Sequence, residues 1–353
     1  MTTTLPDLTP AELAPLAHLR GKRVLVTGGT GFLGRHLLPL LLAAGAEVTC
    51  LVRAASRRDG LPSGIRTLEA DLSRGDGLDE ALRGQDILIH MAALLFGLGW
   101  QDYLRANSTA ARHLAGALAR LRDEGRPLPR VVLVSSLAAS GPCAVPPGRG
   151  DDSPGAPVSA YGWSKLLVEQ ILGRAAGDRL VTLRPPIIYG SGDRGLLPVF
   201  QGLRRGVAAL PGWKRAFPVS VIHARDAARA LLLLCREDAH GVYHVNDGGA
   251  YSMRTFYEGM ARALGRTAHF IPVPVPVLGL TACAASCWGA IRQLVRPGGR
   301  APNWNFDKFR EARHAGWLCD AARIHHELGY VPTVSLEAGL AEAVAGYRAE
   351  GLL

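Results

Sequence analysis

The sequence predicts an α/β protein built on a doubly wound parallel sheet, with a smaller C-terminal α+β lobe. Three observations lead to this fold class. An apolar run from Lys22 to Thr27 stops at a cluster of glycines, a leucine-rich helix over 32–44 ends at Gly45, and a second apolar run covers 47–53. Continuous apolar runs of this length are typical of buried parallel strands, and glycine often ends a helix. Strand, helix and strand in this order form a βαβ unit.

The alternation of strands and helices continues along the chain. Short strands are expected over 66–69, 86–90, 130–135 and 180–185, and helices over 79–82, 103–122 and 159–175, with a Gly- and Pro-rich loop over 141–157. This rhythm is typical of a doubly wound sheet. Beyond residue 186 the pattern loosens into turns, the segment 219–234, a strand over 241–245 and helices from Ser252 onward. That part is expected to form the smaller lobe.

The composition fits a folded protein and narrows its partners. The chain has 353 residues, of which 48% are hydrophobic, and a formal net charge of +10. The positive charge is mostly scattered arginine without a basic run, so nucleic acid is not expected as a partner. Six cysteines without a CxxC pair are expected to be reduced, and no metal site is expected. The N-terminus lacks the pattern of a signal peptide, so a cytoplasmic location is expected.

Glycines at steps of three stand between the first strand and the first helix. Gly28 allows a tight turn, Gly31 lets backbone amides approach a pyrophosphate, and Gly34 lets the helix pack closely on the strand. A pyrophosphate then lies at a helix N-terminus, where free N–H groups favour an anion. This context favours a dinucleotide site over a merely structural turn. The expected cofactor contacts of the turn are Gly28, Thr30, Gly31, Phe32, Leu33 and Gly34.

The dinucleotide site divides the chain into three parts. An N-terminal extension is expected over 1–20, and an NAD(P)-binding domain of the Rossmann type over 21–185. The remainder, 186–353, is expected to be mainly a substrate-binding lobe, with strands that return to the sheet.

The end of the second strand predicts which dinucleotide is bound. An NAD-binding protein places an Asp or Glu there for the ribose hydroxyls. Here the strand ends at Arg53, Arg57 and Arg58 follow, and no acid stands at the strand end. Guanidinium groups suit a 2'-phosphate, so NADP is expected, with NAD as the alternative if these arginines are only solvated loop charges. Asp71 and Leu72, after the third strand, are expected near the adenine.

A serine, a tyrosine and a lysine carry the predicted chemistry. Tyr161 and Lys165 lie one turn apart on the same face of a predicted helix. A nearby cation favours the phenolate, which makes the tyrosine a general acid and base. Ser135 and Ser136 end a strand at the carboxyl edge of the sheet, where ligands of doubly wound folds bind. A hydroxyl there can hold a substrate oxygen, although serines at strand ends also serve simply as turn formers.

The sequence resembles the extended short-chain dehydrogenase/reductase family over nearly its whole length. The matching segments are TGGTGFLG (27–34), Asp71-Leu72, HMAA (90–93), Asn107, VSS (134–136), YGWSK (161–165) and LRPPIIYG (183–190). The resemblance implies that Tyr161 is the catalytic acid/base, that Lys165 also binds the nicotinamide ribose and that Ser136 positions the substrate oxygen. It further implies that Ala92 and Ala93 flank the cofactor, that Asn107 supports the catalytic network, that Pro185 meets the nicotinamide end, and that a homodimer forms through the helices of Asn107 and Tyr161.

Within that family the details point to an apolar substrate. Sugar dehydratases carry an Asp-Glu pair where this chain has Leu137 and Ala138, and nucleotide-sugar epimerases typically place an Asn near the position of Ile187. The chain looks more like the 3β-hydroxysteroid dehydrogenase and dihydroflavonol reductase branch. We therefore expect an NADP(H)-dependent oxidoreductase that interconverts a ketone and a secondary alcohol on a steroid-, lipid- or polyketide-like substrate. The alternatives are a nucleotide-sugar epimerase and a regulator that senses NADP without catalysis.

The segment 272–291 is uncharged and apolar. Its prolines predict only a short uninterrupted helix from Val277, less than the roughly 20 residues of a membrane span. The preferred interpretation is a lid over an apolar substrate pocket, and the alternative is a peripheral membrane contact. Nearby aromatic side chains could line that pocket or belong to an ordinary core: Trp304, Phe306, Phe309 and Trp317.

Overall fold

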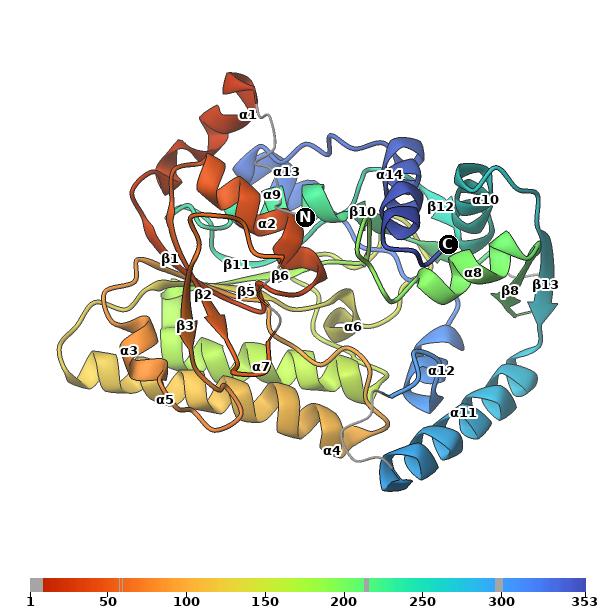
Figure 1. Ribbon diagram of the computed structural model, residues 1–353, viewed down its shortest axis with the longest axis horizontal. Helices are drawn as coiled ribbons and strands as arrows, with labels where there is room; N and C mark the ends of the chain where they lie inside the picture. Colours follow the sequence, from red (N-terminus) through yellow and green to blue (C-terminus); the bar gives the residue numbers. More distant parts are fainter. Residues whose placement is uncertain (1–8, 57, 59, 213–215, 296–300) are drawn as a thin grey trace.

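A seven-stranded parallel sheet forms the centre of the protein. The computed structural model describes residues 9–56, 58, 60–212, 216–295 and 301–353. The strand order is β11-β6-β5-β4-β1-β2-β3 (Figure 1). Their bounds are β1 (Arg23–Thr27), β2 (Glu47–Val52), β3 (Arg66–Glu69), β4 (Ile87–His90), β5 (Arg130–Val134), β6 (Leu180–Arg184) and β11 (Gly241–His244). This confirms the predicted doubly wound α/β fold.

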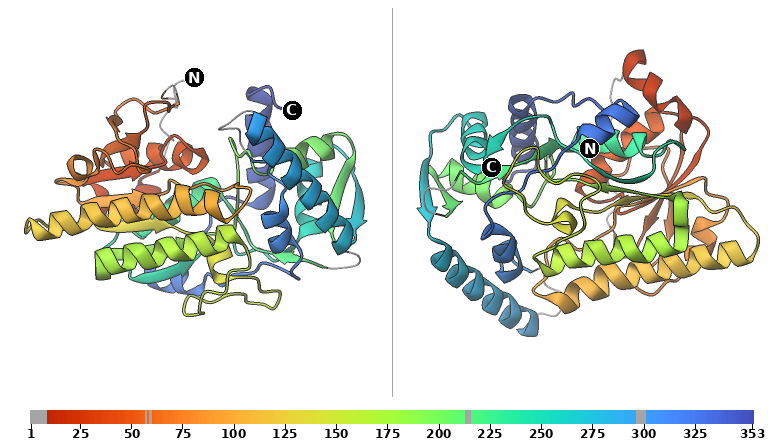
Figure 2. Two further views of the ribbon diagram at one scale, coloured as in Figure 1. Left: turned by 90° about the horizontal axis from the view of Figure 1, so that it is seen from below. Right: turned by 180° about the vertical axis from the view of Figure 1, so that it is seen from behind.

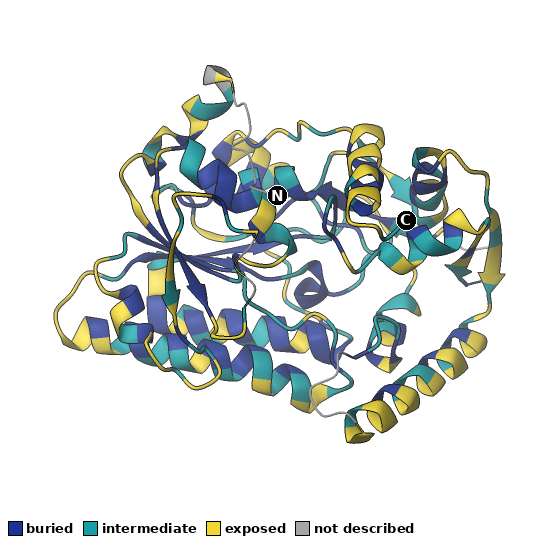
Figure 3. Cartoon of the chain, in the orientation of Figure 1, coloured by how far each residue is buried: buried dark blue, intermediate teal, exposed yellow. Residues whose placement is uncertain are grey.

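Helices cover both faces of the sheet (Figure 2). One face carries α2 (Phe32–Ala43) and α9 (Ala224–Leu233), and the other carries α3 (Leu78–Leu82), α5 (Thr109–Asp123) and α7 (Ala160–Ala176). Two separate cores result, because alternate side chains of each strand point to opposite faces. Val24 and Val26 belong to the first core, whereas Leu25 and Leu133 belong to the second. The strands are therefore buried along nearly their whole length, except at the β3 edge (Figure 3).

The strand order reverses next to β1, which lies between β2 and β4. The chain leaves β1 toward α2 on one face of the sheet. It leaves β4 through a loop toward α5 on the other face, passing α4 (Trp100–Tyr103) and a short π-helix (Leu104–Ser108). Such a switch point opens a crevice at the carboxyl ends of the strands, where ligands of doubly wound proteins bind.

The N-terminal extension is part of the first core. After α1 (Pro10–Leu13), the 3-10 helix η1 (Ala14–Leu19) buries Leu16 and Leu19 beside α2 and α9. The His18 ring contacts the carbonyl of Leu232 at 3.0 Å. Residues 14–19 therefore close one side of the sheet domain.

Short ribbons and helices build the C-terminal lobe. The paired strands are β7 (Ile187–Tyr189) with β10 (Val221–His223), β8 (Val207–Pro211) with β13 (His269–Val273), and β9 (Pro218–Val219) with β12 (Tyr251–Ser252). The helices of the lobe are α8 (Leu197–Arg204), α10 (Met253–Ala263), α11 (Val275–Val295), α12 (Phe306–Ala312) and α14 (Leu336–Ala349). Helix α13 (Ala322–Leu328) instead packs beside β11, and its Ile324 and Leu328 belong to the first core. Phe200, Phe256 and Tyr347 fill the core of this lobe.

The prediction of a short helix from Val277 was wrong. Helix α11 runs over 21 residues, from Val275 to Val295, and it is long and apolar enough to cross a membrane by length and composition. Pro274 precedes the helix and Pro276 lies in its first turn, where the backbone N–H that proline lacks has no partner in the helix. The prolines therefore start this helix instead of interrupting it.

Candidate active site

The glycine-rich turn is shaped by close backbone contacts. Gly28 has φ +75, and a Cβ at this position would lie 2.7 Å from the amide nitrogen of Ala92 at the end of β4. A Cβ on Gly34 would collide with the carbonyl of Gly29, which is how this glycine lets α2 begin directly against the turn. Gly28 therefore needs glycine for both its φ and its lack of space, whereas Gly34 needs it for space alone.

The first turn of α2 is open to an anion. Gly31 is the N-cap, without a side-chain cap, and the first turn contains no acidic residue. Thr30 and Gly31 are exposed, while Phe32 and Leu33 are half-buried. Backbone N–H groups at such a helix start bind phosphate groups well. The turn therefore fits the pyrophosphate of a dinucleotide, which is the role predicted for these residues.

The adenosine end of the crevice has exposed guanidiniums near an acid. Hydrogen bonds from Ser73 lower the pKa of the Asp71 carboxyl most, followed by Arg74, which is 3.6 Å away, and then by Arg53, which follows β2. Arg58 instead forms an ion pair with Glu69 at 3.1 Å. Arg57 lies outside the described residues. Of the two described guanidiniums predicted for a 2'-phosphate, Arg53 is therefore the one near Asp71. The other predicted residue at this end, Leu72, accepts a bond from the ring of His113 through its carbonyl at 2.8 Å.

Asn107 holds the loop that follows β4. Its side-chain oxygen accepts a hydrogen bond from the amide of Leu94 at 2.7 Å, and its side-chain nitrogen donates to the Ser164 hydroxyl at 3.0 Å. This loop carries Ala92 and Ala93, which are half-buried beside the glycine turn. Asn107 therefore joins the predicted cofactor-flanking loop to helix α7, one residue before Lys165.

The two serines at the end of β5 have different surroundings. The hydroxyl of Ser135 is buried and donates to Glu169. The hydroxyl of Ser136 accepts a bond from the amide of Ala138 at 3.1 Å and lies close enough to Tyr161 to lower the pKa of its phenol. Pro185 lies alongside, because its carbonyl accepts a bond from the amide of Leu137 at 2.9 Å. Ser136 is therefore the serine that faces the tyrosine.

Tyr161 and Lys165 are both buried in the first turns of α7. Their residue exposures are 7% and 4%. Burial raises the pKa of the Tyr161 phenol, while the nearby Lys308 ammonium and the Ser136 hydroxyl lower it. Burial also lowers the pKa of Lys165 to about 8, and its ammonium donates to the carbonyl of Val134 at 2.6 Å. The Tyr161 phenol and the Ser136 hydroxyl thus lie close together near the carboxyl end of β5, and the Lys165 ammonium binds the last carbonyl of that strand.

Comparisons with known proteins agree with this geometry. The model of the NAD dependent epimerase/dehydratase family matches residues 24–246. The chain belongs to this family. It is 31% identical to the ceramide reductase of Caulobacter vibrioides, over 94% of this chain and 96% of the relative. It is 29% identical to a 4-hydroxy-2-methyl-3-oxo-4-farnesyl-3,4-dihydroquinoline-1-oxide ketoreductase of Stigmatella aurantiaca, over 90% and 94%.

A solved structure confirms the fold of this family. The UDP-glucose 4-epimerase of Thermus thermophilus, in complex with NAD, matches with a TM-score of 0.69 and 23% identity, over 92% of this chain and 99% of that structure. The family and the relatives establish an extended short-chain dehydrogenase/reductase, an NAD(P)-dependent oxidoreductase.

Helix α12 adds groups to this family site that the sequence did not predict. The carboxylate of Asp307 accepts hydrogen bonds from the amides of Ala160 at 2.7 Å and Tyr161 at 3.1 Å. Glu311 accepts a bond from the hydroxyl of Ser159, the N-cap of α7, at 2.7 Å. Carboxylates are favoured at a helix N-terminus. The C-terminal lobe therefore caps the helix that carries the predicted catalytic tyrosine.

Lys308 lies between these two carboxylates and faces Tyr161. Its ammonium is 4.3 Å from the centre of the Tyr161 ring and 3.0 Å from Glu311. Burial alone would lower the pKa of Lys308, but Glu311 and Tyr161 raise it on balance. It is one of four lysines in the chain, which is the signal in the sequence that could have drawn attention to it.

A buried polar network lies behind the serine and the lysine. Arg184, at the end of β6, forms an ion pair with Glu169 at 2.6 Å and donates to Ser140 at 3.2 Å. Ser140 contacts His244 at 2.6 Å, and His244 contacts Asp151 at 2.6 Å. Glu169 lies one turn beyond Lys165 on the same face of α7, so helical spacing could have suggested that it faces inward. The network ties β5, β6 and β11 together under the site.

The predicted aromatic residues do not form one group. Phe309 is buried against α11, with Trp304 packed on the same small core. Trp317 packs on the cluster of Tyr103 and Tyr161, whereas Phe306 is exposed. Trp317 is therefore the aromatic residue of this set nearest to the predicted catalytic tyrosine.

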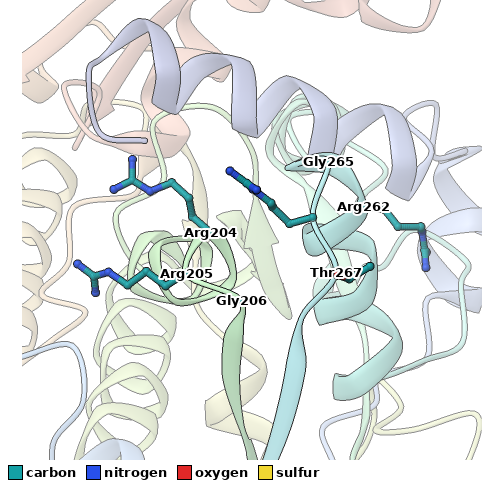
Figure 4. A pocket seen from close by; sticks show the side chains of 7 residues that line it. Arg204, Arg205, Gly206, Arg262, Gly265 and Thr267 are labelled. Atoms are coloured by element: carbon teal, nitrogen blue, oxygen red, sulfur yellow. The ribbon is translucent and has the colours of Figure 1, made fainter.

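A separate hollow of about 600 Å³ lies at the far end of the C-terminal lobe, at the ends of α8 and α10. Its lining includes Arg204, Arg205, Arg262 and Arg266. Arg204 and Arg205 point to one side and Arg262 to the other, so these guanidiniums do not converge on one ligand (Figure 4). Basic residues stabilise helix C-termini, and Arg204 and Arg262 lie in the last turns of α8 and α10.

Within the described part of the chain, no group of three or more His, Cys, Asp or Glu could hold a metal ion.

Proposed function

We propose that this protein is an NADP(H)-dependent oxidoreductase that interconverts a ketone and a secondary alcohol on an apolar, lipid-like substrate. The observation that carries the proposal is the placement of the buried Tyr161 phenol close to Ser136, in the helix that also carries the buried Lys165. A phenol that faces a hydroxyl at the carboxyl edge of the sheet can exchange a proton with a carbonyl oxygen held by both groups.

In the reductive direction, each residue has one task. The Ser136 hydroxyl donates a hydrogen bond to the carbonyl oxygen and so polarises it. The Tyr161 phenol gives its proton to that oxygen, and Lys165 stabilises the phenolate that remains. The nicotinamide, when bound, supplies the hydride to the carbonyl carbon. In the oxidative direction the phenolate of Tyr161 takes the proton of the alcohol.

The apolar substrate class has support from the site and from the relatives. Leu137 and Ala138, which follow Ser136, are buried and apolar and offer no acid or base for an elimination. The two relatives with the widest coverage reported above are a ceramide reductase and a ketoreductase of a farnesyl-bearing compound. These names support a ketone attached to a long apolar group. The nucleotide-sugar epimerase remains the alternative that the experiment below separates.

The preference for NADP rests on Arg53. β2 ends without an acid to accept bonds from ribose hydroxyls, and Arg53 is exposed at that end of the crevice. A guanidinium suits a phosphate dianion geometrically and electrostatically.

We further propose a cytoplasmic homodimer through α5 and α7, which lie side by side on one outer face of the sheet (Figure 2). Sedimentation velocity of the purified protein tests the dimer.

The activity is tested by following NADPH and NADH oxidation with three substrate sets: long-chain β-keto acyl compounds, other apolar ketones, and UDP-sugars. We expect turnover with NADPH and one of the first two sets. Tyr161→Phe should bind NADPH normally and lose turnover, because the proton donor is gone, while Tyr257→Phe on α10 serves as the control. Normal turnover in Tyr161→Phe, or epimerisation of a UDP-sugar without net NADPH oxidation, would refute the proposal.

A further inference from the structure

Helix α11 has a large exposed apolar surface. Leu280, Trp288 and Leu294 are 71%, 65% and 83% exposed. Only 17% of the most apolar 18-residue stretch of the helix is buried. The exposed residues follow the helix along its full length (Figure 3). Contiguous exposed apolar surface of this kind marks a protein or membrane interaction site.

The buried side of α11 is narrow. Leu278, Ala282 and Gly289 are its buried residues, and their spacing of four and seven positions describes one stripe along the helix. Half-buried residues flank this stripe, and the exposed remainder of the helix is apolar apart from residues such as Thr281 and Arg292. A second copy of the chain would cover one further stripe, whereas a lipid phase covers every remaining side at once. The distribution therefore fits a bilayer better than a protein partner.

The charges around α11 also suit a bilayer. The sequence has no Asp or Glu between Pro272 and Phe306, and its basic residues in that range are Arg292, Arg296 and Arg300. Arg292 is exposed in the last turn of the helix. Arginines beside an apolar helix attract anionic headgroups, and an exposed tryptophan such as Trp288 suits the headgroup region.

The contacts of α11 decide its orientation. Near its start, Gly279 lies against the ring of Phe309 on α12, and near its end, Gly289 lies against Leu98 and Pro302. These contacts lie about 15 Å apart along a helix of about 30 Å, so the middle half of the helix runs along the body of the protein. A helix that crosses a bilayer must instead stand clear of the body, since lipid surrounds it on all sides.

We propose that α11 docks this protein flat on an anionic bilayer. The apolar surface around Leu280, Trp288 and Leu294 enters the boundary between headgroups and acyl chains, and Arg292 contacts the headgroups. The loop that holds Leu98 also carries Ala93, and α12 carries the groups that cap α7. Where the proposed function holds, a lipid substrate therefore reaches Tyr161 from the membrane side of the molecule.

Vesicle flotation of the full-length protein tests the docking without any activity. Sucrose density gradients would use phosphatidylcholine vesicles with and without phosphatidylglycerol. The variant Leu280→Glu/Leu294→Glu places two carboxylates on the docking surface. The variant Val145→Glu/Val331→Glu places the same two charges on exposed apolar positions outside α11, which are 72% and 55% exposed. Thermal melting checks that both variants are folded.

We expect the wild type and the control variant to float with the anionic vesicles. The Leu280→Glu/Leu294→Glu variant should float about tenfold less or worse, because carboxylates are strongly disfavoured among acyl chains. The proposal is overturned if the wild type stays with neither vesicle, or if the α11 variant floats as well as the control. It is also overturned if the wild type does not float, is a dimer by sedimentation, and becomes a monomer in the α11 variant. In that case the surface binds a second copy of the chain.

A different observation carries a second inference, about Lys308. Its ammonium lies 4.3 Å from the centre of the Tyr161 ring and 5.7 Å from that of Phe96. Glu311 holds it at 3.0 Å, and 20% of its side chain stays exposed. We propose that Lys308 is a positioning residue for proton transfer, a second cation that acts through Tyr161; this inference rests on the proposed role of Tyr161.

The charged and titratable groups around Tyr161 come from three helices. Helix α12 supplies Lys308, Glu311 and Asp307, and α4 supplies Tyr103, whose ring is 5.8 Å away. Helix α7 itself carries Lys165 one turn further along the chain, with its ammonium on the carbonyl of Val134. Lys308 lowers the pKa of Tyr161, whereas Glu311 raises it. Lys308 and Glu311 thus set the proton affinity of the phenol in opposite directions.

The pH dependence of kcat/KM in both directions tests this second role, with a long-chain β-keto ester and its alcohol as probes. Lys308→Met should raise the pKa of Tyr161 by about one pH unit. Ketone reduction needs the phenol, so its alkaline limb should move to higher pH. Alcohol oxidation needs the phenolate, so its rate at neutral pH should fall about tenfold. Glu311→Gln should instead move the alkaline limb of ketone reduction to lower pH and raise the rate of alcohol oxidation at neutral pH. Lys308→Arg should give the wild-type pH profile.

The outcomes separate the two ideas. If Tyr161→Phe abolishes turnover and Lys308→Met keeps the wild-type pH profile, the role of Lys308 is wrong and the proposed function stands. A loss of rate in Lys308→Met without any movement of the profile has the same meaning, since a merely structural role would produce it. If Tyr161→Phe turns over normally, the proposed function fails, and the inference about Lys308 fails with it.

Discussion

Replacing Asp307 by alanine tests the contact between the C-terminal lobe and the catalytic helix. The Asp307 carboxylate is buried and accepts the amides of Ala160 at 2.7 Å and Tyr161 at 3.1 Å. Hydrogen bonds to a charged group contribute about 1.5–3 kcal/mol each, and exposure to water recovers part of that when both are lost. We therefore expect the first turn of α7 to lose about 3 kcal/mol of local stability.

Native-state hydrogen exchange measures this loss directly. In Asp307→Ala, the amides of Ala160 and Tyr161 should exchange about 100-fold faster, while amides in β1 stay unchanged. The kcat should fall about tenfold or more, because the phenol is no longer held in one place. NADPH affinity should stay the same, since the glycine turn lies on β1 and α2. Asp307→Asn keeps one oxygen acceptor, so its exchange rates and kcat should lie between those of the wild type and Asp307→Ala.

Two results would refute this reasoning. Wild-type exchange rates at both amides in Asp307→Ala would show that the carboxylate does not cap the helix in solution. An equal loss in Glu337→Ala, which removes an exposed acid from the first turn of α14, would show a general effect of charge.

Four other changes have defined outcomes. Gly34→Ala should weaken NADPH binding by calorimetry at least about tenfold, because a Cβ would displace the Gly29 carbonyl; unchanged binding contradicts the role of the turn. Arg53→Ala should raise the Kd for NADPH about tenfold or more and leave that for NADH unchanged. Arg184→Met should lower the unfolding free energy in urea by about 3–5 kcal/mol, since it leaves Glu169 buried without its partner, and adding Glu169→Leu should restore much of it. Burial lowers the pKa of Lys165 from 10.5 to about 8. Between these pH values the unfolded chain binds more protons than the folded one, so the unfolding free energy of the wild type should rise with pH relative to that of Lys165→Met. The same pH dependence of the unfolding free energy in both proteins, measured in urea, would contradict this.

The predictable parts of the site are those encoded by local spacing. The glycines at 28, 31 and 34 and the pair Tyr161 and Lys165 each lie within a few positions on one strand-turn-helix unit or one helix. Their relative placement follows from the geometry of that unit alone. The strand bounds were likewise predictable to within one or two residues, because a buried parallel strand is a continuous apolar run.

The remaining parts depend on packing between distant segments. Asp307 caps an amide 147 positions away, and nothing in the spacing of Asp307, Lys308 and Glu311 reveals which helix they will meet. The error at α11 has a different origin. Proline at 276 breaks a helix interior but suits its first turn, so the same residue has opposite effects at positions two or three residues apart.

The last strand of the sheet reaches the ribosome exit long after the other six. β11 spans Gly241–His244 and pairs with β6. During synthesis, β6 therefore waits as an open edge while about 60 further residues are added, and an unpaired edge invites pairing with other chains. The Asp307 cap on α7 arrives later still. A fragment ending at residue 185 would keep the glycine turn and the Tyr161 sequence, yet it would expose that edge and an uncapped catalytic helix, so we expect it to aggregate.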